Sequence, residues 1–419
     1  MVIKMPVFSD GQKIAASQWN RLIESIPASY VIWKDGDTYR AECLMKGGTD
    51  YSGTNASTVI QSAIDSLTNG GTIFFKAGTY ELSSSITIKD KISLIGEMES
   101  KVSSAVTIFT RASGFSGDMI QTDAVYVDSL DDNTQDIKIK NLIFNGGNVG
   151  TCLDLTNVDT AVIEEVRVAY CDTAIYLGYD GDQTNDNVYP GDIRIIKCRL
   201  DANTYGIYME RNLGNMISHT KISSADYALY VKCCKILHVT KNSFYNFDTC
   251  AIKLVDDSNE HLESIIINDN RFYTTESAMY IDIDKTHAST SRIMINDNVF
   301  SYSALDRPNA FDIPSDLSYS SFRGNTGYHA MSEQCGVASI SAENTSVTVT
   351  HNLAWAPDVV TVTPAANIGS VWVDTITDTQ FTIHCETAPT SDTSVYWLSL
   401  IHISEPTRPL YISYAVFCL

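Results

Sequence analysis

A short apolar strand pattern recurs through the middle of the chain and restricts the fold more than any other feature. Each copy starts with a small residue and then alternates an apolar, a variable and an apolar side chain. The seven copies are CLDL (152–155), AIYL (174–177), GIYM (206–209), ALYV (228–231), AIKL (251–254), AMYI (278–281) and AFDI (310–313). Successive copies start 22, 32, 22, 23, 27 and 32 residues apart, which suits coils of three short strands with variable loops. The pattern predicts a solenoid of stacked coils.

A second column of strands, IIKCRL, VTKNSF, INDNRF and INDNVF, supports the same period. Its asparagines are Asn242, Asn270 and Asn298, at intervals of 28 residues, followed by Asn325. Asparagine tolerates the left-handed backbone of a tight corner, and stacked amides can hydrogen-bond along a solenoid axis. The phenylalanines two residues further on are expected to stack inside: Phe244, Phe272 and Phe300.

The segment before the repeats contains a helical stripe and short strands. Val59, Ile60, Ala63, Ile64 and Leu67 share a helix face that starts after Asn55 or Ser57 and ends at Gly70-Gly71. The other matching positions are Asp50, Gly53, Thr54, Gln61, Asp65, Thr72, Gly78-Thr79-Tyr80 and Leu94-Ile95-Gly96-Glu97. In this order they resemble the N-terminal cap and first coils of the pectate-lyase-like right-handed parallel β-helix superfamily. The resemblance implies an all-β fold, a right-handed single-stranded parallel β-helix with an N-terminal capping helix.

The rest of the chain is expected to form smaller parts around this body. Residues 1–30 predict a docking helix segment, and 31–48 predict a β-hairpin that turns at Asp35-Gly36. The β-helix is expected over 49–330. Residues 338–397 alternate apolar and polar side chains in about five strands, which predicts a small C-terminal antiparallel β-sandwich. This last part resembles the C-terminal β-domains of phage and archaeal-virus tail fibres.

Residues 398–419, LSLIHISEPTRPLYISYAVFCL, differ in pattern from what precedes them. They resemble a translated sequencing adapter: Leu398 to Arg408 match one frame of a transposase adapter, and Ile412 to Leu419 match a flow-cell primer. We therefore treat 398–419 as an adapter-derived artefact, and expect natural sequence to end near Trp397.

One face of the first strand column is expected to point outward and form a ladder, because side chains alternate across a strand. Its members are Asp154, Tyr176, Tyr208, Tyr230, Lys253, Tyr280 and Asp312, with Glu210, Lys232 and Asp282 in a charged column beside it. Neighbouring coils lie about 4.8 Å apart. The tyrosines would then form an aromatic strip that stacks on sugar C–H faces. Exposed tyrosines also stabilise strands, so a purely structural role is the alternative.

Three acids are the catalytic candidates on this face. Asp282 and Asp284 are i, i+2 neighbours, about 7 Å apart along a strand, which suits an inverting pair of carboxylates. Glu210 is three coils from Asp282, or about 14 Å. The NTD, GHG and RIK motifs of polygalacturonase-type relatives do not occur, so the aspartate pairs of the chain lack the context of the family's DD motif, and no recognisable pectate-lyase-type calcium site occurs. The resemblance therefore does not imply the catalytic mechanism of these relatives.

No cofactor is expected, with calcium as the alternative. The loop GYDGDQTNDNVYPGD places Asp180, Asp182 and Asp186 at spacings that suit weak metal ligands, but it lacks the glycine and distal glutamate of an EF-hand. A solvated acidic loop is the alternative reading.

The formal charge is −21, with 29 Lys+Arg and 50 Asp+Glu, and no basic run occurs. We therefore expect no nucleic-acid partner and no membrane insertion, and a neutral or weakly charged glycan suits the composition. The start of the chain has no apolar signal core, which is compatible with assembly in a host cytoplasm.

The preferred hypothesis is a tail-spike-like virion protein that binds, and in addition depolymerises, host surface polysaccharide. The resemblance implies a homotrimer and contacts with other virion proteins through the N-terminus. A stand-alone extracellular polysaccharide lyase or glycoside hydrolase is one alternative. A non-catalytic structural adhesin is the other.

Overall fold

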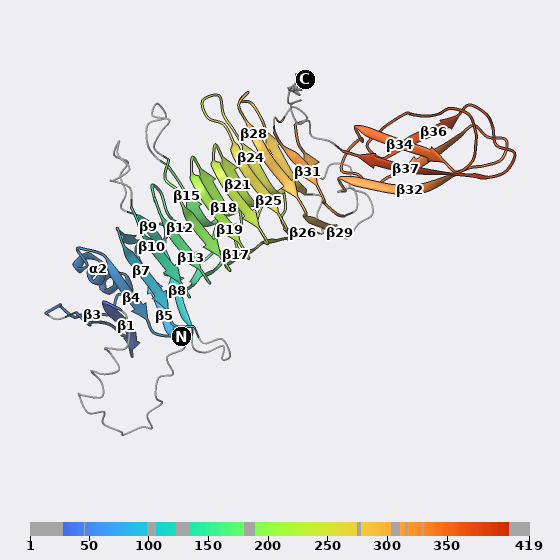
Figure 1. The fold of residues 1–419 in the computed structure, drawn as a ribbon. Coiled ribbons are helices and arrows are strands. Elements are labelled where there is room, and N and C mark those ends of the chain that lie inside the picture. Colours follow the sequence, from blue (N-terminus) through green and yellow to red (C-terminus); the bar gives the residue numbers. More distant parts are fainter. Residues whose placement is uncertain are drawn as a thin grey trace, which may run out of the picture.

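The computed structural model describes residues 28–45, 47–98, 106–122, 134–179, 189–274, 278–302, 311–314, 317, 319–327 and 331–401. The described residues form a nearly all-β protein with a long parallel solenoid and a separate small sandwich (Figure 1). The expected docking helix within residues 1–30 and the greater part of 398–419 lie outside the described residues.

Three long sheets run the length of the solenoid. Sheet 1 has 13 strands, of which the first three belong to the N-terminal hairpin region. In spatial order they are β3 (Tyr51–Gly53), β2 (Thr38–Cys43), β1 (Tyr30–Asp35), β4 (Gly71–Phe75), β7 (Ile92–Gly96), β10 (Ile137–Lys140), β13 (Ala161–Glu164), β16 (Ile193–Ile196), β19 (Leu213–Ser218), β22 (Lys235–Thr240), β25 (Glu263–Asn268), β28 (Ser291–Asn296) and β31 (Ser321–Arg323).

Sheets 2 and 3 have nine strands each. Sheet 2 contains β5 (Gly78–Leu82), β8 (Thr107–Arg111), β11 (Ile143–Asn145), β14 (Arg167–Ala169), β17 (Arg199–Asp201), β20 (Lys221–Ser223), β23 (Ser243–Tyr245), β26 (Arg271–Thr274) and β29 (Val299–Tyr302). Sheet 3 contains β6 (Ile86–Ile88), β9 (Ile120–Thr122), β12 (Thr151–Asp154), β15 (Thr173–Leu177), β18 (Tyr205–Glu210), β21 (Tyr227–Lys232), β24 (Cys250–Val255), β27 (Met279–Asp284) and β30 (Phe311–Asp312). The chain visits sheets 1, 2 and 3 in turn, so each coil supplies one parallel strand to each sheet. The predicted β-helix is confirmed.

A short helix closes the N-terminal end of the core. Helix α2 (Ala56–Ser66) starts after Asn55, whose side chain accepts a hydrogen bond from the backbone N–H of Thr58 at 3.1 Å. Val59 and Ile60 are among the side chains that it buries against the first coils. The expected capping helix is confirmed.

Buried asparagines hold the turn from sheet 1 to sheet 2. The side-chain oxygen of Asn270 accepts from the backbone N–H of Asn242 at 2.9 Å, and its amide donates to the carbonyl oxygen of Val239 at 2.8 Å. Asn298 repeats this arrangement one coil further on. Because each amide satisfies backbone groups of the preceding coil, the ladder fixes where the coils of Asn242, Asn270, Asn298 and Asn325 turn.

The solenoid core is apolar and densely packed. Phe244 and Phe272 stack with ring centroids 4.8 Å apart, and Phe272 and Phe300 with centroids 4.7 Å apart. The prediction that these rings stack inside is confirmed.

The C-terminal part is a sandwich of two three-stranded antiparallel sheets. One contains β32 (Glu333–Ile340), β37 (Thr393–Leu400) and β34 (Val359–Pro364), and the other contains β33 (Ser346–Thr350), β36 (Gln380–Cys385) and β35 (Val371–Asp374). Ile340, Phe381, Ile383 and Val395 form its core. β37 runs to Leu400, so three residues of the adapter-like stretch pair within this sheet.

We predict that Asn270→Ala lowers the free energy of unfolding of the β-helix by about 3 kcal/mol, because it leaves two buried backbone groups of the preceding coil, the N–H of Asn242 and the carbonyl oxygen of Val239, without partners. Chemical denaturation followed by circular dichroism measures the change. Asn203→Ala is the control, since Asn203 is exposed and makes a side-chain contact of 3.5 Å with Asp172. Equal effects of the two substitutions would contradict the role of the ladder.

Candidate functional site

The outer face of sheet 3 carries tyrosines in three neighbouring coils. Tyr176, Tyr208 and Tyr230 are direct partners in the register of β15, β18 and β21. Their ring centroids are 5.2 Å and 5.0 Å apart along the row. The predicted adjacency of these side chains is confirmed, and we call the three the tyrosine ladder.

Two further tyrosines, which sequence reasoning missed, widen the ladder. The rings of Tyr205 and Tyr227 stack with centroids 5.6 Å apart and an interplanar angle of 18°. Tyr205 also lies 5.1 Å from the ring of Tyr208, and Tyr227 lies 5.5 Å from that of Tyr230. The signal was present, because YGIY and YALY repeat the same tyrosine pair in adjacent copies.

Rings of the tyrosine ladder meet edge to face. The interplanar angles are 75° between Tyr176 and Tyr208 and 71° between Tyr208 and Tyr230. Aromatic pairs prefer this arrangement, and it presents alternating ring faces and edges instead of one flat platform. Burial, with smaller contributions from Glu210 and the adjacent tyrosines, raises the pKa of Tyr208. Its hydroxyl therefore remains a hydrogen-bond donor over the physiological pH range.

Tyr280 does not belong to this face, and the prediction that it points outward is wrong. β27 pairs with β24 so that Asp282, and not Tyr280, lies opposite Lys253. Tyr280 is 1% exposed, and its ring centroid lies 4.9 Å from that of Phe300 in the core. It occupies the place of the small first residue of the other copies. An alternating strand satisfies two registers that differ by two residues, and the core beside Phe300 accepts the large ring.

Lys253 bridges the two aspartates of β27. Its Nζ lies 2.5 Å from Oδ2 of Asp282 and 2.7 Å from Oδ2 of Asp284. Because both oxygens contact one ammonium group, they are no more than 5.2 Å apart. The expectation of an inverting pair about 7 Å apart is therefore wrong, since both side chains bend toward Lys253.

The two aspartates differ in their surroundings. Asp282 is 6% exposed, whereas the side chain of Asp284 is 53% exposed. Burial raises the pKa of Asp282, although its bond to Lys253 opposes the shift, and the carboxylates of Asp284 and Asp312 add to it. Among the described residues, Oδ1 of Asp282 has no hydrogen-bond partner. A buried acid beside an exposed one is an arrangement that can separate proton donor from proton acceptor.

Lys253 keeps its charge in this cluster. Burial disfavours the ammonium form, but the bonds to Asp282 and Asp284 outweigh it and raise the pKa of Lys253. The ammonium group therefore neutralises one carboxylate, which weakens the pair as a free acid–base couple.

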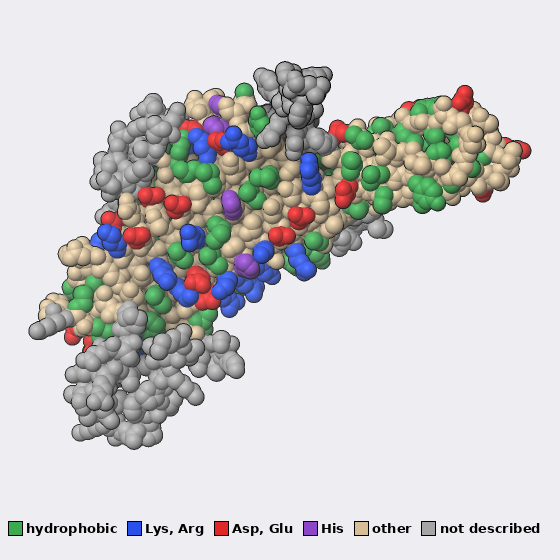
Figure 2. Space-filling view, in the orientation of Figure 1, with side chains coloured by type: hydrophobic (Ala, Val, Ile, Leu, Met, Phe, Trp, Pro, Cys, Tyr) green, Lys and Arg blue, Asp and Glu red, His purple; other side chains and the backbone are tan. Residues whose placement is uncertain are grey.

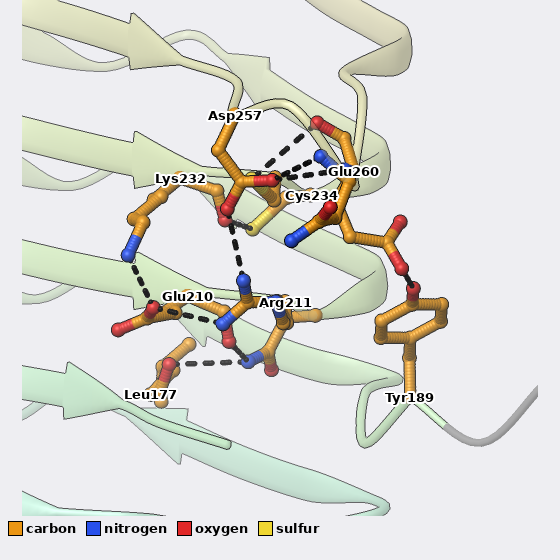
Figure 3. Close-up of polar contacts among 11 residues, drawn as sticks. Leu177, Tyr189, Glu210, Arg211, Lys232, Cys234, Asp257 and Glu260 are labelled. Carbon is orange, nitrogen blue, oxygen red and sulfur yellow. Dashed lines mark hydrogen bonds and ion pairs between the residues drawn. The ribbon is translucent and has the colours of Figure 1, made fainter. Parts of the chain in front are cut away.

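Glu210 belongs to a second charged cluster (Figure 3). Its carboxylate accepts from Lys232 at 2.7 Å and from the buried Arg211 at 3.2 Å. Arg211 also donates to Asp257 at 2.9 Å. Lys232 lies opposite Glu210 in the strand register, as its position in the predicted charged column requires.

The structure does not bring Glu210 to the aspartates of β27. Its column continues through Lys232 and Val255 to Asp284, so three coil steps, or about 14 Å, separate Glu210 from Asp284. Asp282 lies in the column of the tyrosine ladder and not in that of Glu210 and Lys232, which corrects its expected place.

Sequence reasoning also missed Arg211 and Asp257. The two are 46 residues apart and follow the ends of β18 and β24, so no local motif joins them. Burial would raise the pKa of Asp257, but backbone N–H donors at Asn259 and Glu260, together with Cys233 and Arg211, hold it below its usual value.

The described residues were compared with the requirements of a metal site and of a membrane-spanning helix. Within the described ranges, no group of three or more His, Cys, Asp and Glu side chains is placed to hold a metal ion. Asp180, Asp182 and Asp186 lie outside the described residues, so the calcium loop stays a prediction. None of the described helices has the length and apolar character needed to cross a membrane.

Fold and surface together define a pectate lyase-like β-helix protein. The family model described as rhamnogalacturonase A/epimerase, pectate lyase-like, matches residues 48–276, more than half of the 419-residue chain. The chain therefore belongs to this family. A comparison with curated proteins produced no match.

Solved structures of similar fold come from several sources. The tailspike protein gp49 of Acinetobacter baumannii bacteriophage Fri1, described as a capsular polysaccharide depolymerase, is 10% identical, with 82% of each chain covered and a TM-score of 0.37. The tailspike of E. coli bacteriophage HK620, in complex with a pentasaccharide, is 12% identical, with 83% of this chain and 90% of that chain covered and a TM-score of 0.46. The A-module of the Azotobacter vinelandii mannuronan C-5 epimerase AlgE6 is 13% identical, with 65% and 89% covered and a TM-score of 0.41.

The raised pKa of Asp282 predicts a pH-dependent contribution to stability. The folded protein holds this proton to a higher pH than the unfolded chain, whose value is near 3.8. The contribution is therefore present below about pH 3.8 and is lost as pH rises through the folded-state pKa.

We accordingly predict that the stability of Asp282→Asn relative to the natural protein increases as pH rises above 3.8. Urea unfolding at a series of pH values measures it, and Asp248→Asn, an exposed aspartate that does not contribute to the pKa shift of Asp282, is the control. A relative stability that falls with pH would mean that the ion pair with Lys253 outweighs burial.

Proposed function

We propose that the chain is a tail-spike-like or tail-fibre-like virion protein that binds a host surface polysaccharide along sheet 3. The observation that carries the proposal is the tyrosine ladder with charged clusters at its flank. Tyrosine rings stack on sugar C–H faces, and the carboxylates and ammonium groups beside them bind hydroxyls. The family supports a carbohydrate ligand, because its description names a rhamnogalacturonase, an epimerase and pectate lyases.

The binding residues in this proposal are Tyr176, Tyr208, Tyr230 and Lys232, with Tyr205 and Tyr227 widening the surface. Lys232 and Glu210 hold each other at 2.7 Å at the border of the ladder. Because Lys232 remains half-exposed, its remaining N–H donors face a ligand on the ladder.

Depolymerisation is the second part of the proposal. Asp282, with its raised pKa, acts as the proton donor, and Asp284 is the carboxylate beside it. The Lys253 bridge favours the alternative of a non-catalytic adhesin, because it neutralises the pair in the absence of substrate. A stand-alone extracellular lyase or hydrolase is the remaining alternative, and the same surface would serve it.

As a virion protein, the chain would form a homotrimer and contact other virion proteins through its N-terminus. Support for self-association comes from the outer face of the sheet formed by β32, β37 and β34. Val337 is 60% exposed there, Tyr396 53% and Val359 45%. Adjacent exposed apolar side chains commonly mark interaction surfaces.

We predict that replacing Tyr208 by Ala lowers affinity for the bound polysaccharide about two- to tenfold, and that the triple change of Tyr176, Tyr208 and Tyr230 to Ala lowers it further, because each ring contributes about 0.5–1.5 kcal/mol of stacking. A glycan array finds the ligand, and calorimetry measures the affinity.

The matched controls are Tyr170→Ala and Tyr319→Ala, since each of these rings is 61% exposed and lies off the ladder. If binding survives the triple change, or falls equally in the controls, the tyrosine ladder is not the binding surface.

Cleavage has its own prediction. If the protein depolymerises the polysaccharide, the double variant Asp282→Asn, Asp284→Asn loses about 10²–10⁴-fold in rate, as expected for removal of acid–base groups. Reducing ends and unsaturated products are measured on the polysaccharide that the array identifies. Unchanged product formation would exclude Asp282 and Asp284 as catalytic residues. If the natural protein forms no products, the non-catalytic adhesin is the hypothesis that remains.

A further inference from the structure

A row of cations lies on sheet 2, away from the tyrosine ladder, on a chain whose formal charge is −21. Arg167, Arg199 and Lys221 are consecutive partners at the first position of β14, β17 and β20. Arg271 follows in the same column after Ser243. One coil step is about 4.8 Å, so the row presents positive charge at regular, short intervals.

Lysines extend the row onto the turn that precedes sheet 2. Lys197 and Lys241 have left-handed backbone, with φ of 55° and 58°. At the equivalent turns of other coils, Asn141 and Asp269 adopt the same conformation. Asparagine and aspartate adopt it more readily than lysine, so the backbone does not favour lysine here. We call six side chains the basic corner: Arg167, Lys197, Arg199, Lys221, Lys241 and Arg271.

Most of this charge is not neutralised within the protein. Arg199 pairs with Asp201 at 3.2 Å, and Lys197 lies 3.7 Å from its nearest carboxylate. In the part of the chain that the structure describes, four of the six cations have no ion-pair partner: Arg167, Lys221, Lys241 and Arg271. Like charges directly opposite one another destabilise a sheet, so folding does not account for the row.

A pair of stacked tyrosines borders the basic corner. The rings of Tyr245 and Tyr273 have centroids 4.6 Å apart and an interplanar angle of 27°. Nζ of Lys221 lies 4.7 Å from the ring centroid of Tyr245, which is 38% exposed. In Figure 2, Lys and Arg side chains gather along the lower edge of the solenoid, where Figure 1 places β17 and β26. This edge therefore combines ring faces with a line of cations.

We propose that the basic corner binds a polyanionic polysaccharide whose carboxylate groups repeat along an extended chain. Guanidinium groups bind carboxylates in bidentate fashion, and the stacked tyrosines suit the C–H faces of the sugar rings. The charge of −21 disfavours a nucleic acid, whose phosphates are denser than the carboxylates of a glycan. The surface is separate from the tyrosine ladder, and the inference does not depend on what the ladder binds.

The test uses the full chain and polygalacturonate as the probe, with uncharged dextran of equal length beside it. Calorimetry at low and high salt measures affinity. We expect binding of polygalacturonate that weakens with salt, and weak or no binding of dextran. The triple variant Arg167→Gln, Lys221→Gln, Arg271→Gln should lose affinity at least about tenfold, because each removed cation leaves a carboxylate unpaired.

A control variant carries the same change of net charge on exposed cations elsewhere: Lys34→Gln, Lys91→Gln and Arg292→Gln. It should bind polygalacturonate as the natural protein does, and so should the triple alanine variant of the tyrosine ladder. The proposal is overturned if polygalacturonate does not bind, if the control loses as much affinity as the basic-corner variant, or if the ladder variant alone loses it. Tighter binding of a DNA duplex than of polygalacturonate would assign the surface to nucleic acid instead.

Discussion

The turn between sheets 1 and 2 sets the register of the strands on either side of it, and from Asn242 to Asn325 buried asparagine amides hold that turn. Asn242, Asn270 and Asn298 each bond backbone groups of a neighbouring coil, so the coils cannot slip past one another without breaking buried hydrogen bonds. A fixed turn fixes the register of the strands on either side. Side chains that are 22 to 32 residues apart in sequence become neighbours because the strands pair in a fixed parallel register, and both the tyrosine ladder and the basic corner follow from this.

Sequence reasoning reached the fold because a solenoid repeats one local pattern. The apolar face of the capping helix, the inner stack of Phe244 and Phe272, and the adjacency of Tyr176 and Tyr208 all follow from period and alternation. These features depend on which residue recurs and not on long-range detail, so a single sequence contains them.

The parts that sequence reasoning missed depend on loops, on register or on side-chain reach. Tyr280 lies two residues from its expected register. A strand that alternates regularly fits two registers that differ by two residues, and packing of the Tyr280 ring in the core selects the observed one. Arg211 meets Asp257 through turns of unrelated sequence. The basic corner has no basic run in the sequence, since stacking of coils brings its cations together. The docking helix and the acidic loop lie outside the described residues and remain predictions.

Sheet 3 changes character along its length. Tyrosines face outward in β15, β18 and β21, whereas Lys253 and Asp282 take the same column in β24 and β27 and the aromatic ring of Tyr280 moves into the core. The aromatic stretch of this column therefore has two different flanks: the carboxylate of Asp154 in β12 on one side, and the ammonium group of Lys253 with Asp282 beyond it on the other. A linear glycan also has two chemically different ends. A surface with two different flanks distinguishes the two directions in which such a chain can lie, so under the proposed function the solenoid imposes a polarity on its ligand.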